Sequence, residues 1–91
     1  MISKHIHLTG RVQGVGFRDW IARRARRQGI AGWVRNRADG TLEALIAGDA
    51  DAVDDLLRAC RRGPPHAEVL SVTEHFADPP SEPGFFKRPT V

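Results

Sequence analysis

The sequence has a single cysteine, Cys60, and only one acidic residue before position 38. One cysteine cannot form an intramolecular disulfide, and it cannot supply a thiolate cluster for a metal ion. The chain also lacks an apolar run long enough to span a membrane, and no basic and apolar leader precedes Ile6. These absences predict a cytoplasmic protein without membrane association.

Acidic residues are scarce only in the first part of the chain. Between Met1 and Arg37, nine basic residues accompany Asp19 alone, a formal charge of +8, whereas the remainder has five basic and ten acidic residues, a charge of −5. The length of 91 residues and the hydrophobic fraction of 41% predict a single folded domain over residues 1–91. The basic first third predicts an anionic partner, either a nucleic acid or a small phosphorylated molecule.

Hydrophobic periodicity predicts a regular succession of strands and helices. The first half is expected to have a strand over 4–12, a helix over 17–28 and a strand over 31–37. A turn at Asp39-Gly40 joins this strand to the next, over 41–47. A second helix follows, capped by Asp49 or Asp51 and ended by Gly63-Pro64-Pro65, and then a strand over 68–76. Residues 85–88 can add a short edge strand. Two strand-helix-strand units joined by a hairpin indicate an α+β, ferredoxin-like βαββαβ fold, an antiparallel sheet with both helices on one face.

The same periodicity predicts which side chains form the core. They are Ile6, Leu8 and Val12; Phe17, Ile21, Ala22 and Ala25; Leu42, Ala44 and Ile46; and Val53, Leu56, Leu57 and Cys60. The expected topology also brings three connections to one end of the sheet. These are the loop over 13–16, the end of the second strand near Asn36, and the loop over 63–66.

The segment Gly10–Arg18 joins the first strand to the first helix and has the strongest chemical pattern in the chain. A glycine-rich turn at a helix N-terminus presents consecutive backbone N–H groups, which form a concave anion site. A P-loop needs Gly-Lys-Ser/Thr, and a dinucleotide fingerprint needs a third glycine where Asp19 stands, so neither motif is present. Arg18, in the first helical turn, has a planar fork that can hold two phosphate oxygens.

These motifs resemble those of the acylphosphatases over nearly the whole chain. Gly10–Arg18 is similar to the first signature of that family, and Gly32–Asn36 followed by Asp39–Thr41 is similar to the second. The similarity continues through Gly63-Pro64 and a phenylalanine-rich C-terminal strand.

The resemblance implies a small enzyme that hydrolyses the carboxyl-phosphate bond of an acyl phosphate without a metal or another cofactor. It implies that Arg18 binds the phosphoryl group and Asn36 positions the attacking water. The phosphate cradle would be completed by the backbone of Gln13, Gly14, Val15, Gly16 and Phe17. Inorganic phosphate or a similar anion is expected at this loop, and the enzyme is expected to be a monomer that binds neither nucleic acid nor membranes.

Elementary chemistry agrees with this expectation. The leaving carboxylate has a conjugate acid with a pKa of about 4, so no general acid is needed at neutral pH. Phosphoryl transfer asks mainly for positioning and for stabilised charge on the equatorial oxygens, which Arg18 and backbone N–H groups can supply. The amide of Asn36 can hold a water in line but cannot remove its proton, so the substrate phosphate is the expected acceptor.

One position departs from the family pattern. Members often have threonine three residues after the arginine of the first motif, and this chain has Ile21. A hydroxyl hydrogen bond is lost there, so we expect a change in efficiency and not in chemistry.

Several other readings of the sequence stay open. The alternative function is a non-catalytic or RNA-binding module of the same fold, although the first and third strands lack the aromatics on which such modules stack bases. His5 and His7 could begin a metal site, but an exposed sheet face is the favoured interpretation. His66 is a candidate near the site, and at least one of Trp20 and Trp33 is expected to pack between helix and sheet.

Overall fold

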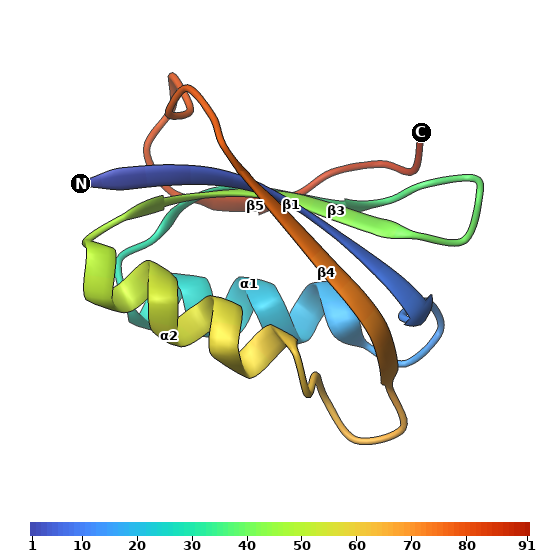
Figure 1. Cartoon of the computed structure of the whole chain (residues 1–91). Helices are drawn as coiled ribbons and strands as arrows, with labels where there is room; N and C mark the ends of the chain where they lie inside the picture. The colour runs from blue at the N-terminus through green and yellow to red at the C-terminus, as the bar shows by residue number, and fades with distance from the viewer.

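The computed structural model describes residues 1–91 as one sheet covered on one face by two helices (Figure 1). The elements are β1 (Ile2–Arg11), α1 (Phe17–Arg27), β2 (Ala31–Asn36), β3 (Leu42–Gly48), α2 (Ala50–Cys60), β4 (Glu68–Phe76) and β5 (Phe85–Lys87). The predicted ferredoxin-like βαββαβ order is confirmed, with element ends shifted by one or two residues. Neither helix is long and apolar enough to cross a membrane.

The sheet has the strand order β4-β1-β3-β2-β5. The first four strands pair antiparallel, and β2 and β3 form the predicted hairpin. These four strands form the predicted antiparallel sheet. The short C-terminal strand that the sequence allowed is confirmed as β5, which pairs parallel with β2 and makes the complete sheet mixed. The parallel pairing arises because the loop after β4 carries the chain to the opposite edge before β5 begins.

The hydrophobic core lies between the sheet and the helices. Each predicted core side chain is buried, including the helix stripe of Phe17, Ile21, Ala22 and Ala25. The predicted side chains Ile6 and Leu8 of β1 are buried, as is Val12 directly after the strand. Trp20 packs against this core, as predicted for one of the two tryptophans, whereas Trp33 stacks with Arg35 away from it.

Two helix ends differ in detail from their predictions. Asp49 occupies the N-cap position of α2, but its side chain makes no capping hydrogen bond. Its charge still lies beside the positive end of the helix dipole. α2 ends at Cys60, before the predicted Gly63-Pro64-Pro65 breaker, and Gly63 has the positive φ of 73° that a glycine after a helix commonly adopts.

Three connections meet at one end of the molecule, as the topology predicts. The loop after β1 lies toward the same end as the β2–β3 hairpin and the loop after α2 (Figure 1). A Cβ added at Gly63 would come within 2.9 Å of the Phe17 ring, so the loop after α2 packs directly on the start of α1. This end carries the candidate site.

Candidate active site

A hollow of about 120 Å³ opens where α1 begins and β2 ends. The hollow is lined by Val12, Gly16, Phe17, Arg18, Asp19, Asn36 and Lys87. The structure therefore brings together Arg18, near the start of α1, and Asn36, at the end of β2.

The end of the loop before α1 and the first turn of the helix line this hollow, from Gly16 to Asp19. Gly14 and Gly16 both have positive φ, 73° and 77°, which allows the turn. The first backbone hydrogen bond of the helix runs from the Trp20 N–H to the Gly16 carbonyl, and no N–H from Gly14 to Asp19 donates to another backbone group. Consecutive free N–H groups at a helix N-terminus attract an anion through their partial positive charge.

The two side chains that were expected to carry the chemistry are free of protein partners. Arg18 is half-buried yet takes part in none of the ion pairs of the chain. Asn36 is also half-buried, and only its backbone is bound, its carbonyl accepting a hydrogen bond of 3.2 Å from the Val91 N–H. A free guanidinium and a free amide can both turn their full hydrogen-bonding capacity to a ligand.

Sequence reasoning missed Lys87, which β5 places at the edge of the hollow. Its ammonium forms an ion pair with Asp19. The hydrogen bond and charge of Lys87 hold the pKa of Asp19 below its usual value, and the charge of Arg18 contributes in the same direction. Periodicity could not reveal this contact, because it depends on the parallel pairing of a three-residue strand.

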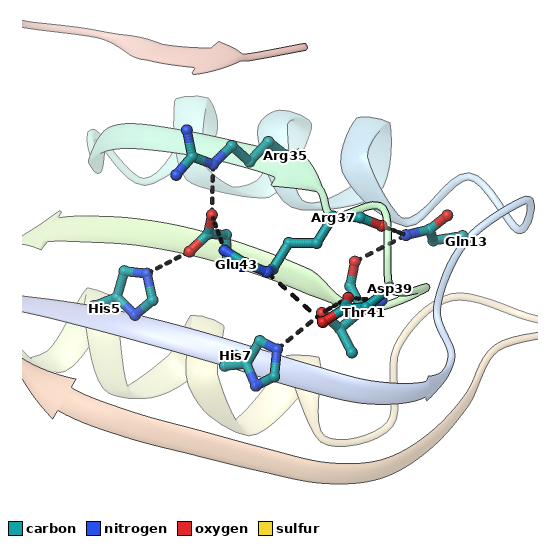
Figure 2. Close-up of polar contacts among 8 residues, drawn as sticks. All are labelled: His5, His7, Gln13, Arg35, Arg37, Asp39, Thr41 and Glu43. Atoms are coloured by element: carbon teal, nitrogen blue, oxygen red, sulfur yellow. Dashed lines mark hydrogen bonds and ion pairs between the residues drawn. The ribbon is translucent and has the colours of Figure 1, made fainter. Parts of the chain in front are cut away.

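Three residues of the expected cradle, Gln13, Gly14 and Val15, do not line the hollow. Gln13 turns its side chain toward the hairpin. Its Nε2 donates to the Arg37 carbonyl at 2.8 Å and to the Thr41 carbonyl at 2.9 Å (Figure 2). These two bonds tie the loop before α1 to the hairpin that follows Asn36.

A buried carboxylate, which the sequence analysis did not predict, lies on the sheet face away from the helices. Glu43 has a side chain only 6% exposed, and it accepts hydrogen bonds from Arg35, His5 and Arg37 (Figure 2). Burial alone would raise the pKa of Glu43, but the hydrogen bonds from Arg35 and His5 outweigh it and lower the pKa. The sequence could have indicated one of these contacts only. In the hairpin of β2 and β3, Arg35 pairs directly with Glu43, and two oppositely charged residues at paired positions favour an ion pair.

This cluster engages the guanidiniums of Arg35 and Arg37, so neither stands free to attract an anion. Both guanidiniums contact the Glu43 carboxylate, and Arg37 also lies 3.9 Å from Asp39. The carboxylate compensates much of their charge. Among the charged side chains that line the hollow, Arg18 alone has no ion-pair partner.

The hairpin turn is fixed by its own side chains. Asp39 accepts hydrogen bonds from the Thr41 backbone N–H at 3.0 Å and from the Thr41 hydroxyl at 2.6 Å, and these bonds lower the pKa of Asp39. The Thr41 hydroxyl in turn lies 2.8 Å from Nε2 of His7. Because that hydroxyl donates its proton to Asp39, His7 must be the donor in the second bond, which assigns its proton to Nε2.

The remaining candidates lie outside the hollow. His5 and His7 bind Glu43 and Thr41 on the open face. His66 is exposed in the loop after α2 and does not line the hollow. Ile21 is fully buried in the core. Cys60 is buried as predicted, and loss of hydration raises the pKa of its thiol to about 12.

Comparison with known proteins shows the family of this chain. The model of the family described as Acylphosphatase matches residues 4–87. The acylphosphatase of Acidiphilium cryptum (strain JF-5) is 72% identical over 90 residues, which cover 99% of each chain. The acylphosphatase of Rhizorhabdus wittichii (strain DSM 6014 / CCUG 31198 / JCM 15750 / NBRC 105917 / EY 4224 / RW1) is 46% identical, covering 99% of this chain and 91% of the relative.

Solved structures show the same relationship. The crystal structure of acylphosphatase from Bacillus subtilis matches with a TM-score of 0.88 at 33% identity, covering 96% of this chain and 97% of that chain. These similarities extend over nearly the full length of both partners and include the segments that form the hollow. The chain therefore belongs to the acylphosphatase family of hydrolases.

Proposed function

We propose that the hollow binds the phosphoryl group of an acyl phosphate and that Arg18 and Asn36 carry its hydrolysis to a carboxylate and inorganic phosphate. The observation that supports this most is the meeting of a partner-free guanidinium, a partner-free amide and a row of unused backbone N–H groups in one small hollow. A scaffold or binding module of the same fold would need neither side chain in that place.

In the proposed reaction, Arg18 and the N–H groups at the start of α1 hold the equatorial oxygens of the phosphoryl group. They stabilise the charge that spreads over these oxygens in a loose transition state. The carboxamide of Asn36, across the hollow, holds a water in line with the bond to the leaving carboxylate. No metal ion takes part in this scheme, because a carboxylate departs without a Lewis acid or a general acid.

The proton of the attacking water goes to the substrate phosphate. Asn36 cannot accept it, and Asp19, the carboxylate at the edge, is bound to Lys87 with a lowered pKa, which makes it a poor base. His66 is exposed outside the hollow. A pH–rate profile tests this assignment, since a limb that vanishes in His66→Ala would show that a histidine and not the substrate takes the proton.

The enzyme is proposed to act as a monomer in the cytoplasm, without nucleic acid or a membrane as partner. Its only cysteine, Cys60, is buried with a raised pKa, which is compatible with a reducing compartment.

A direct assay tests the proposal. Benzoyl phosphate is incubated with the protein in excess chelator, and the release of inorganic phosphate is followed above the spontaneous rate. Sustained turnover supports metal-free hydrolysis at this site. A protein that binds phosphate but leaves benzoyl phosphate intact would instead be the non-catalytic module, and turnover that stops with chelator would overturn the metal-free scheme.

A further inference from the structure

Gln13 spans the boundary between the two parts of the proposed site. The residue belongs to the loop that leads to Gly16 and Arg18, and its side-chain amide bonds to the hairpin that follows Asn36. The two parts lie far apart in sequence, at residues 13–18 and 36–41. In the structure, this amide bridges them through hydrogen bonds to both ends of the hairpin turn (Figure 2).

The acceptors of Gln13 are the two carbonyls that close the hairpin turn. The Arg37 carbonyl already accepts from the Gly40 N–H at 3.0 Å, and the Thr41 carbonyl accepts from the Arg37 N–H at 2.9 Å. The Gln13 amide adds a second donor to each of these carbonyls, at 2.8 and 2.9 Å. One NH₂ group therefore fixes both ends of the turn relative to the loop.

Asn36 lies next to the two hydrogen bonds that Gln13 makes to the hairpin. Its backbone is paired with Leu42 in β3, and the next residue along the chain, Arg37, supplies one of the two anchored carbonyls. The side chain of Asn36 has no protein partner of its own, so its place in the hollow depends on how its backbone is held. A small shift of the hairpin would move the Asn36 amide relative to Arg18.

We propose that Gln13 is a positioning residue, whose side-chain amide sets the place of Asn36 relative to the phosphate-binding loop. This inference rests on the proposed function, because it gives Asn36 the water to hold. It assigns the side chain of Gln13 no contact with phosphate, in keeping with its absence from the lining of the hollow.

The test replaces Gln13 with methionine, which has a similar length and no hydrogen-bond donor. The matched control is Gln28→Met, because Gln28 is exposed at the end of α1 and its side chain makes no hydrogen bond to the protein. Both variants are assayed with benzoyl phosphate well below their melting temperatures. Inhibition by inorganic phosphate reports the phosphate-binding loop separately.

In Gln13→Met, kcat should fall by about tenfold to a hundredfold, because misplacement of a reacting group by 1 Å can cost that much. The inhibition constant of phosphate should change less than about twofold, since Arg18 and the N–H groups are retained. Gln28→Met should match the native protein in both. An unchanged kcat, or a weakened phosphate affinity in Gln13→Met, would overturn the proposal.

A double-mutant cycle with Asn36→Ala gives the sharper readout. If Gln13 acts through Asn36, then Gln13→Met should lower kcat by less than about twofold once Asn36 is already alanine. Effects that multiply would show that Gln13 acts by another route, which overturns this proposal alone. A full kcat in Asn36→Ala itself would remove Asn36 from the mechanism, and with it both proposals.

A second substitution covers the case in which Gln13→Met does not fold. Gln13→Asn keeps the NH₂ donor on a shorter side chain, which cannot reach both carbonyls. Its kcat should fall less than that of Gln13→Met, again with the phosphate inhibition constant retained. A kcat equal to the native value in Gln13→Asn would count against the proposal, because the bridge would then be unnecessary.

Discussion

Lys87 forms an ion pair with Asp19 at the edge of the hollow that Arg18 and Asn36 line. The pair joins the last strand of the sheet to the first turn of α1. Asp19 is the only carboxylate among the residues that line the hollow, and it would repel a phosphorylated substrate if its charge were uncompensated. We therefore expect Lys87 to favour substrate binding by offsetting the charge of Asp19 beside Arg18.

Replacing Lys87 with alanine should raise KM for benzoyl phosphate with little change in kcat. Asp19 is exposed and water screens its charge, so the expected increase is at most about fivefold. The double variant Lys87→Ala/Asp19→Asn should recover the native KM, because the uncompensated charge is then gone. Steady-state kinetics at low salt measures both, and an equal KM in the two variants would contradict the charge argument.

Arg18→Ala should lower kcat/KM by at least about a thousandfold, because both phosphate binding and charge stabilisation depend on the guanidinium. Inhibition by inorganic phosphate should weaken in parallel. Arg23→Ala is the matched control, since Arg23 is exposed on the same helix and does not line the hollow. Turnover in Arg18→Ala close to that of the control would exclude Arg18 from the reaction.

Asn36→Ala should lower kcat by about a hundredfold while leaving phosphate inhibition nearly unchanged. The amide is proposed to touch the water and not the phosphoryl group, so its loss removes an interaction made in the transition state. The fold should be retained, because the side chain makes no hydrogen bond within the protein. Circular dichroism checks the fold, and a loss of phosphate affinity would place Asn36 on the phosphoryl group instead.

The sequence was sufficient for the helices, the main strands and the end of the sheet where Arg18 and Asn36 meet. These features follow from local periodicity and from the handedness of the crossovers, both of which depend on residues close in the chain. The motif around Gly14 and Gly16 likewise depends on local backbone conformation. Such patterns are readable because neighbouring residues decide them.

Contacts that depend on the exact register between distant segments could not be predicted from the sequence. Lys87 reaches Asp19 only because β5 crosses to the far edge and pairs parallel with β2. Glu43 contacts His5, Arg35 and Arg37 because pairing with two other strands brings these residues beside it. The side chain of Gln13 binds two carbonyls of a hairpin more than twenty residues away, and no local pattern encodes such a contact.

Glu43 also predicts how stability depends on pH. Its pKa in the folded protein is lowered, so its ion pairs contribute fully above the ordinary pKa of 4.5 and are lost as the pH falls through the folded-state value. Glu43→Gln should lower the free energy of unfolding at pH 7 by about 2 kcal/mol, less than for a fully buried pair because Arg35 and Arg37 are partly exposed.

The difference between the native protein and Glu43→Gln should therefore be constant above about pH 5 and should shrink on acidification below pH 4.5, as the native carboxylate becomes protonated. Urea unfolding from pH 7 to pH 3 measures it. Glu82→Gln is the matched control, because Glu82 is exposed and lies 3.8 Å from Arg88 in its only ion pair, so its effect should stay near zero. A gap between native protein and Glu43→Gln that stayed constant down to pH 3 would show that Glu43 contributes by packing and not as an ionised carboxylate.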